Sequence, residues 1–193
     1  MATRTMTVKS GGRPALGWHE VTIKKATFDT NDNDSTFIDI WFNELPETLN
    51  MRVYEAFDKQ GNEFAVGSVF RFANAGITAV LDGPNGEKSV TIDDNPNGLR
   101  DHKLSVYLYA DPKNPKYSRV LKQPAPTVFQ NEVEQFSEED VKYWMDRAEG
   151  YYNKYVKDGV PGTHKTTGTT VDLTPKEPVK VEAATAATAD IPF

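Results

Sequence analysis

The chain has 193 residues, of which 38% are hydrophobic and 26% are charged, a balance typical of a globular domain with appendages. It contains no cysteine, which excludes a disulfide framework and a thiolate metal site and favours a reducing, cytoplasmic location. No apolar run is long enough to span a membrane, and residues 1–12 lack the apolar core of a signal peptide, so we expect no membrane association.

The charge is unevenly distributed along the chain. The net charge is −6, and residues 131–193 carry 12 acidic against 7 basic side chains. Residues 100–122 reverse this balance, with six basic and two acidic side chains. Because the local field decides what a groove attracts, the overall acidity does not exclude binding to nucleic acid.

The N-terminal part predicts an arm followed by a strand. Residues 1–17 contain several glycines and a proline, and we expect a flexible arm. The alternation over residues 18–28 predicts a first strand with Val21 and Ile23 on its buried face.

Two further strands are expected after the turn-rich residues 30–34. The second covers residues 36–42 and the third residues 49–57, with Arg52 and Tyr54 on the polar face of the third. The second strand places Ile38, Ile40 and Phe42 on one face and Phe37, Asp39 and Trp41 on the other.

The middle of the chain predicts a short helix and then a hairpin. Ser68 is a suitable N-cap for the helix, and Gly76 is a suitable end. Residues 82–101 are rich in turn formers and indicate loops around a short strand near 89–92. Alternation over 103–110, a turn, and a return over 117–121 predict a hairpin.

A second helix is expected within residues 131–159. Ser137 and Asp140 have the spacing of a capping box, and apolar positions follow at helical spacing. This stripe, which includes Trp144, predicts packing on the domain or contact between copies of the chain in a homo-oligomer.

Three strands, a short helix and a closing hairpin, in this order, predict a mainly β fold. Residues 18–130 are expected to form an OB-fold-like five-stranded barrel, with a twisted open sheet as the alternative. Such barrels commonly bind oligonucleotides on the outer face of their second and third strands.

Residues 160–193 predict a disordered tail with an unusual tip. The segment 161–189 contains no aromatic residue and cannot bury enough apolar surface to offset the entropy of ordering. It nevertheless ends in Asp190, Ile191, Pro192 and Phe193. We interpret these four residues as a partner-binding tip for a hydrophobic pocket with a basic rim.

A barrel followed by a tail ending in Asp-Ile-Pro-Phe resembles the single-stranded DNA-binding proteins (SSB). The domain looks most similar to the divergent OB-fold members carried by bacteriophages, in which a Gly-rich opening, an aromatic second strand and a Tyr-bearing hairpin recur. This resemblance implies single-stranded DNA binding in replication or recombination, in the cytoplasm of a bacterial host, with partner proteins recruited by the tip. Residues 185–189 carry no acidic side chain, unlike the usual acidic run of the family, so we expect a weaker or more selective partner contact.

Binding a single strand requires flat side chains for the bases and cations for the phosphates. The outward faces of the expected strands supply both, most densely on the hairpin. The stacking candidates are Phe37, Trp41, Tyr54, Tyr107, Tyr109 and Tyr117, and the phosphate candidates are Arg52, Lys103, Lys113, Lys116 and Arg119.

These residues also allow structural interpretations. Phe37 and Trp41 at alternating positions are equally consistent with packing, although Asp39 between them favours a solvent-exposed face. Tyr107 and Tyr109 have packing under the C-terminal helix as their alternative.

The lysines near the hairpin turn have an alternative role of their own. Lys113, Lys116 and Lys122 are equally consistent with a solvated hairpin end that resists edge pairing.

Enzyme motifs are lacking. The sequence has no Gly-rich phosphate loop, and we expect neither catalysis nor a cofactor. The acidic groups 93–94 and 138–140 lie in a loop and in a helix first turn, where a structural role is favoured. The alternative functions are a protein-binding adaptor and, less consistent with the tip, a phage structural barrel. The sequence does not distinguish an RNA ligand from a DNA ligand, because aromatic side chains stack on the bases of either.

Overall fold

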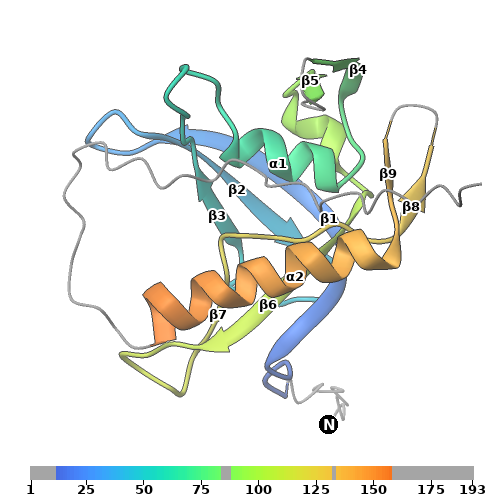
Figure 1. Ribbon diagram of the computed structural model, residues 1–193. Helices are drawn as coiled ribbons and strands as arrows, with labels where there is room; N and C mark the ends of the chain where they lie inside the picture. The colour runs from blue at the N-terminus through green and yellow to red at the C-terminus, as the bar shows by residue number, and fades with distance from the viewer. Residues whose placement is uncertain (1–11, 84–87, 132–133, 158–193) are drawn as a thin grey trace, which may run out of the picture.

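The computed structural model describes residues 12–83, 88–131 and 134–157, and the notation of its elements follows Figure 1. The partner-binding tip predicted at residues 190–193 therefore lies outside the described residues. The strands are β1 (Gly17–Thr30), β2 (Thr36–Phe42), β3 (Met51–Tyr54), β4 (Ile77–Asp82), β5 (Lys88–Ile92), β6 (Lys103–Ala110), β7 (Ser118–Val120), β8 (Phe129–Gln130) and β9 (Gln135–Phe136). The helices are α1 (Ala65–Phe72) and α2 (Glu138–Tyr152), with a 3₁₀ turn η2 (Pro96–Leu99) and a π turn η3 (Asn153–Lys157).

Five antiparallel strands form a nearly closed barrel, which confirms the OB-fold-like prediction. Their order is β3-β2-β1-β6-β7, so β3 and β7 are the two edges of the sheet. The hairpin predicted near the end of the domain is formed by β6 and β7, which pair from Leu108–Val120 to Ala110–Ser118.

The first strand, β1, serves both halves of the barrel. Its residues from Gly17 to Thr22 pair with β6, and those from Ile23 to Thr30 pair with β2. A bulge between Ile23 and Lys25 separates the two parts and changes which residues face inward. Val21 and Ile23 are buried before the bulge, whereas Ala26 is buried after it.

The core lies inside the barrel and under α1. The predicted inward face of β2, formed by Ile38, Ile40 and Phe42, is confirmed as buried. Alternate residues of β6 complete the opposite wall, and Val69 and Phe70 of α1 cover one end. The main contributors to this core are Val21, Ile23, Ile38, Ile40, Met51, Val53, Val69, Phe70, Leu104, Val106 and Leu108.

The predicted start of α1 at Ser68 is wrong. The helix begins at Ala65, and the carboxylate of Glu63 accepts hydrogen bonds from the backbone amides of Ala65, Val66 and Gly67 at 2.7–2.9 Å. Ser68 lies inside the helix, where its hydroxyl donates to the carbonyl of Phe64. A carboxylate two residues before the helix satisfies the same free amides as an N-cap hydroxyl.

The prediction that Gly76 ends the first helix is wrong, because α1 ends at Phe72 with Ala73 as its C-cap. Gly76 instead allows a close approach between two backbone segments. Gly76 has a φ of +67°, and a Cβ atom there would lie 2.1 Å from the carbonyl oxygen of Asp93. The backbone of Gly76 also accepts a hydrogen bond from Asp93 at 2.7 Å.

Two small hairpins were not predicted. β4 and β5 pair from Ile77–Ile92 to Asp82–Lys88, where the sequence indicated a single short strand among loops. β8 and β9 form a second hairpin just before α2. Their short, turn-rich sequences give little periodicity, and contacts with α1 and α2 hold them in place.

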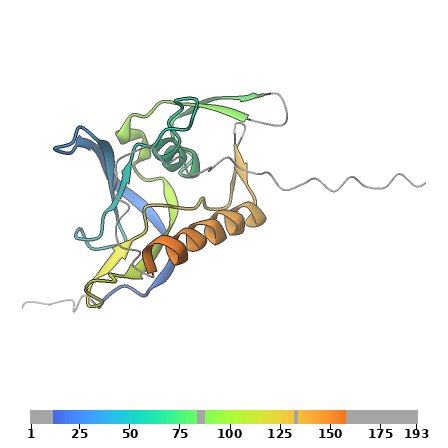
Figure 2. The same cartoon turned by 60° about the vertical axis from the view of Figure 1, so that its left-hand side comes forward.

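The C-terminal helix packs along the outside of the barrel (Figures 1 and 2). Its predicted capping box is confirmed, with Ser137 as N-cap and Asp140 at the third position. Trp144 contacts Phe72 near the middle of the helix, and Tyr152 contacts the outer face of β6 at its end. Neither of the described helices is long and apolar enough to cross a membrane.

The core packing generates a stability prediction. Leu104→Ala should lower the free energy of unfolding by about 2–5 kcal/mol, because Leu104 is fully buried and its removal leaves a cavity. Leu81→Ala on the exposed β4 edge is the matched control and should change stability by less than about 0.5 kcal/mol. Urea unfolding followed by circular dichroism measures both, and similar losses for the two variants would contradict this core assignment.

Candidate nucleic-acid interface

A groove of about 660 Å³ lies at the open side of the barrel. It separates β3 and the loop before it from the β6–β7 hairpin. β3 and β7 are the two edge strands of the described sheet. The residues that line it are Gly12, Arg13, Pro14, Pro46, Thr48, Leu49, Asn50, Arg52, Tyr109, Asp111, Lys116, Tyr117, Ser118, Arg119 and Val120.

Basic side chains outnumber acidic ones in this groove. Arg13, Arg52, Lys116 and Arg119 line it, against the single carboxylate of Asp111. The groove therefore has a net positive lining, although the whole chain is acidic.

Arg13 is a groove residue that the sequence assigned to the flexible arm. Its guanidinium donates to the hydroxyl of Ser118 at 2.7 Å and to the carbonyls of Pro115 and Tyr117 at 2.8 and 3.2 Å. These acceptors are neutral, so they orient the guanidinium without cancelling its charge. No sequence pattern around Arg13 marks this contact, which joins residues about one hundred positions apart.

The turn of the hairpin is organised by Asp111. Its Oδ2 accepts from Nε of Arg119 at 2.6 Å, and its Oδ1 accepts from the amide of Lys113 at 2.9 Å. The Arg119 guanidinium, followed by the Lys113 amide, holds the pKa of the Asp111 carboxyl below its ordinary value. This arrangement fixes the turn and leaves Lys113 and Lys116 exposed on it, although only Lys116 lines the groove.

The outer face of β2 and β3 carries a stacked group of side chains. Arg52 binds Asp39 through two hydrogen bonds, Nε to Oδ1 at 2.8 Å and Nη2 to Oδ2 at 2.6 Å. The bonds to Asp39 raise the pKa of the guanidinium above its ordinary value. The same guanidinium lies 3.8 Å from the ring centre of Phe37, and Tyr54 contacts that ring from the side.

Two predictions for this face need correction. Phe37 is only 3% exposed beneath Arg52 and Tyr54, so its ring is not open to a base in this structure. The interpretation of Asp39 as a mark of a solvent-exposed face is also wrong. Asp39 is buried, its carboxylate neutralised by Arg52 and accepting a further hydrogen bond from the side-chain amide of Asn50.

The accessible aromatic side chains of this face are Trp41 and Tyr54. Trp41 is half-buried, and Lys25 of β1 places its Nζ 4.3 Å from the ring centre. Lys25 was missed because regular alternation along the sequence places it on the same inward face as Val21 and Ile23. The bulge interrupts this alternation and turns Lys25 outward.

Tyr107 and Tyr109 pack under α2. The sequence allowed this packing as the alternative to base stacking for these two residues. Tyr152 lies 5.4 Å from Tyr107 and 5.2 Å from Tyr109, measured between ring centres. Trp18 covers the other side of Tyr107 and donates its indole N–H to Glu149 at 2.7 Å. Burial raises the pKa of both β6 tyrosines.

The two tyrosines at the hairpin end remain beside the groove. Tyr109 still lines it with one side, and Tyr117 is 64% exposed at its rim. The hairpin therefore keeps a stacking surface, although a smaller one than the sequence predicted.

Lys103 is the one phosphate candidate at the opposite end of β6 from the turn. It binds Glu20 at 2.7 Å, and this hydrogen bond raises the pKa of the lysine. It does not line the groove, so the structure separates it from the hairpin cations.

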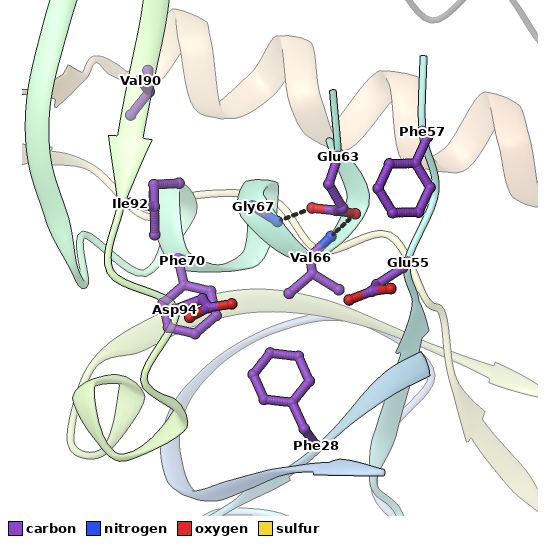
Figure 3. Close-up of a pocket in the computed structure, with 10 residues that line it drawn as sticks. All are labelled: Phe28, Glu55, Phe57, Glu63, Val66, Gly67, Phe70, Val90, Ile92 and Asp94. Atoms are coloured by element: carbon purple, nitrogen blue, oxygen red, sulfur yellow. Dashed lines mark hydrogen bonds between the residues drawn. The ribbon is translucent and has the colours of Figure 1, made fainter. Parts of the chain in front are cut away.

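A second concavity of about 250 Å³ lies between α1, β5 and the end of β3 (Figure 3). Phe28, Phe57 and Phe70 give it an apolar lining, while Glu55 and Asp94 add carboxylates. Within the described part of the chain, no lysine or arginine lines this pocket, so it disfavours a phosphate. The described ranges also contain no group of three or more His, Asp and Glu side chains placed to hold a metal ion.

Comparison of the chain with protein-family models, with curated proteins and with solved structures gives no match.

The Asp111 contacts generate a pH prediction. Because the folded-state pKa of Asp111 is depressed, its stabilising effect is present above the unfolded pKa of about 4 and is lost as the pH falls through the folded value. Asp111→Asn should therefore lower the urea midpoint at pH 6, and the gap to wild type should narrow below about pH 4. A gap that stays constant down to pH 2 would assign the effect to something other than this carboxylate.

Proposed function

We propose that this protein is a non-catalytic single-stranded DNA-binding protein. The groove at the open side of the barrel carries the proposal, because it combines four basic side chains with two tyrosines in a space bounded by strand edges. OB-type barrels hold single strands in this kind of setting, with cations for the backbone and rings for the bases.

The phosphates are assigned to the cations that line the groove. Arg13 and Lys116 are the best placed, because neither forms an ion pair with a carboxylate in the described contacts. Arg52 and Arg119 already bind Asp39 and Asp111 and would contact phosphate with their remaining N–H groups.

The bases are assigned to accessible aromatic rings, two that line the groove and two on the neighbouring strands. Tyr117 and Tyr109 lie on the hairpin side, and Tyr54 and Trp41 lie on the outer face of β3 and β2. Stacking contributes about 1–3 kcal/mol per base and tolerates any sequence, so we expect little sequence preference. The choice of DNA over RNA rests on the family resemblance, since stacking and phosphate contacts accept either.

The second part of the proposal concerns residues 190–193. Asp190, Ile191, Pro192 and Phe193 would bind a replication or recombination protein and raise its effective concentration on coated DNA.

The pocket of Figure 3 favours a second candidate function, a protein-binding adaptor. Its mixture of aromatic and acidic lining suits a basic or apolar side chain of a partner protein rather than a nucleic acid. A chain that binds no oligonucleotide at low salt but captures a protein partner through Phe193, insensitive to nuclease, would favour this candidate.

The groove assignment predicts a change in affinity and in salt dependence. Lys116→Ala and Arg13→Ala should each weaken binding to an oligo-dT roughly tenfold at low salt, equivalent to about 1.4 kcal/mol for one charge-assisted contact. The slope of log K against log salt should fall by about 0.7 for each lost phosphate contact.

Fluorescence anisotropy with a labelled oligonucleotide measures both quantities. Lys59→Ala is the control, since Lys59 is exposed but does not line the groove. Equal losses for all three variants would indicate a general charge effect, and no loss for any of them would contradict the groove assignment.

The tip assignment predicts a separation of two activities. Deletion of residues 191–193 should leave oligo-dT affinity unchanged, because the groove lies within residues 12–120. The same deletion should abolish recovery of replication or recombination proteins from a nuclease-treated bacterial extract by the immobilised chain. A large loss of DNA affinity on deletion would contradict this division of labour.

A further inference from the structure

A group of aromatic and basic side chains surrounds the C-terminal end of α2 and the π turn η3 that follows it, and we call it the helix-end patch. Its members are the half-buried Tyr151 and the exposed Tyr155, Lys122 and Lys154. The rings of Tyr151 and Tyr155 lie 5.1 Å apart. Lys122 places its Nζ 5.4 Å from the ring centre of Tyr151, and Lys154 places its Nζ 4.9 Å from that of Tyr155.

This patch is distinct from the side of α2 that packs on the barrel. Tyr152 makes the ring contacts with the barrel strand β6 at this end of the helix. Tyr155 is 42% exposed, and its described ring partners are Tyr151 and Lys154, both within the same helical segment. A pair of rings, with Tyr155 exposed and Tyr151 half-buried, that is flanked by lysines has the composition of a stacking surface for nucleic acid.

The local charge favours an anionic ligand. Residues 151–157 contain Lys154 and Lys157 and no acidic side chain, and Lys122 adds a third positive charge. Asp146 is paired with Lys142, whereas Glu149 keeps its full charge because the indole N–H of Trp18 is a neutral donor, and Asp158 follows Lys157 in the sequence. The partial negative charge at a helix C-terminus is only about half a unit, so the three lysines outweigh it together with Glu149 and Asp158.

The patch adjoins the groove. Tyr109 lines the groove and contacts Tyr152, which is the neighbour of Tyr151 in the chain. Val120 of β7 also lines the groove, and Lys122 follows it by two residues. Figures 1 and 2 both show this end of α2 beside the β6–β7 hairpin.

We propose that the helix-end patch is a second contact for the same single strand of nucleic acid. The strand continues from the groove across β7, so that bases stack on Tyr155 and Tyr151 and phosphates meet Lys122 and Lys154. This inference rests on the proposed function and extends it, because it makes the affinity depend on the length of the strand.

The test compares oligo-dT of about 5 and about 16 nucleotides, near the ends of the range that one OB fold covers. The full-length variant Tyr155→Ala/Lys154→Ala should bind the short oligonucleotide like wild type and the long one about tenfold more weakly. Tyr143→Ala is the matched control, since Tyr143 is equally exposed on α2 but lies three turns away from Tyr155.

Each other outcome overturns the inference in a recognisable way. Unchanged affinity of the double variant for the long oligonucleotide overturns the patch and leaves the groove standing, whereas wild type that binds neither length overturns both proposals. Equal losses on both lengths would show a general charge effect. If sedimentation shows that wild type is a dimer and the double variant a monomer, the patch is instead an interface between copies of this chain.

Discussion

The continuous strand β1 is the constraint on which the rest of the structure depends. It pairs with β6 along its first half and with β2 along its second, and the bulge at Lys24 joins the two parts. Because the bulge adds one residue, it shifts the alternation of inward and outward side chains and places Lys25 on the outer face beside Trp41. The same bend closes the sheet nearly into a barrel and leaves β3 and β7 as unpaired edges of the described sheet, with the groove between them.

The second helix divides the outer surface of this barrel into a covered and an open part. α2 uses Tyr152 and Glu149 to contact Tyr107 and Trp18, and both rings are half-buried. On the outer face of β2 and β3 only part of the surface is accessible, at Trp41 and Tyr54, and Tyr109 lies at the boundary between the two parts. The position of α2 therefore decides which aromatic residues of the barrel can meet a ligand and brings the tyrosines of the helix end beside the groove.

Buried carboxylates orient the cations of the candidate interface. Asp39 and Asp111 are both largely buried, and each needs a charged hydrogen-bond partner to offset its lost hydration. Arg52 and Arg119 meet this need with some of their guanidinium N–H groups. Each guanidinium is therefore held in a fixed direction. The surface is thus pre-organised, and its positive field comes mainly from Arg13 and Lys116, which no described carboxylate neutralises.

Local periodicity was enough to predict the barrel strands, the capping box at Ser137 and the inward face of β2, because each depends on neighbours within a few residues. Alternation also identified which side chains share the outer faces, but it carries no information about what covers them. Only the tertiary structure decided that Arg52 covers Phe37, that α2 covers Tyr107, and that Glu63 rather than Ser68 caps α1. Arg13 and Lys25 enter the interface for the same reason: one through a contact between distant segments, the other through a bulge, and neither leaves a periodic signal in the sequence.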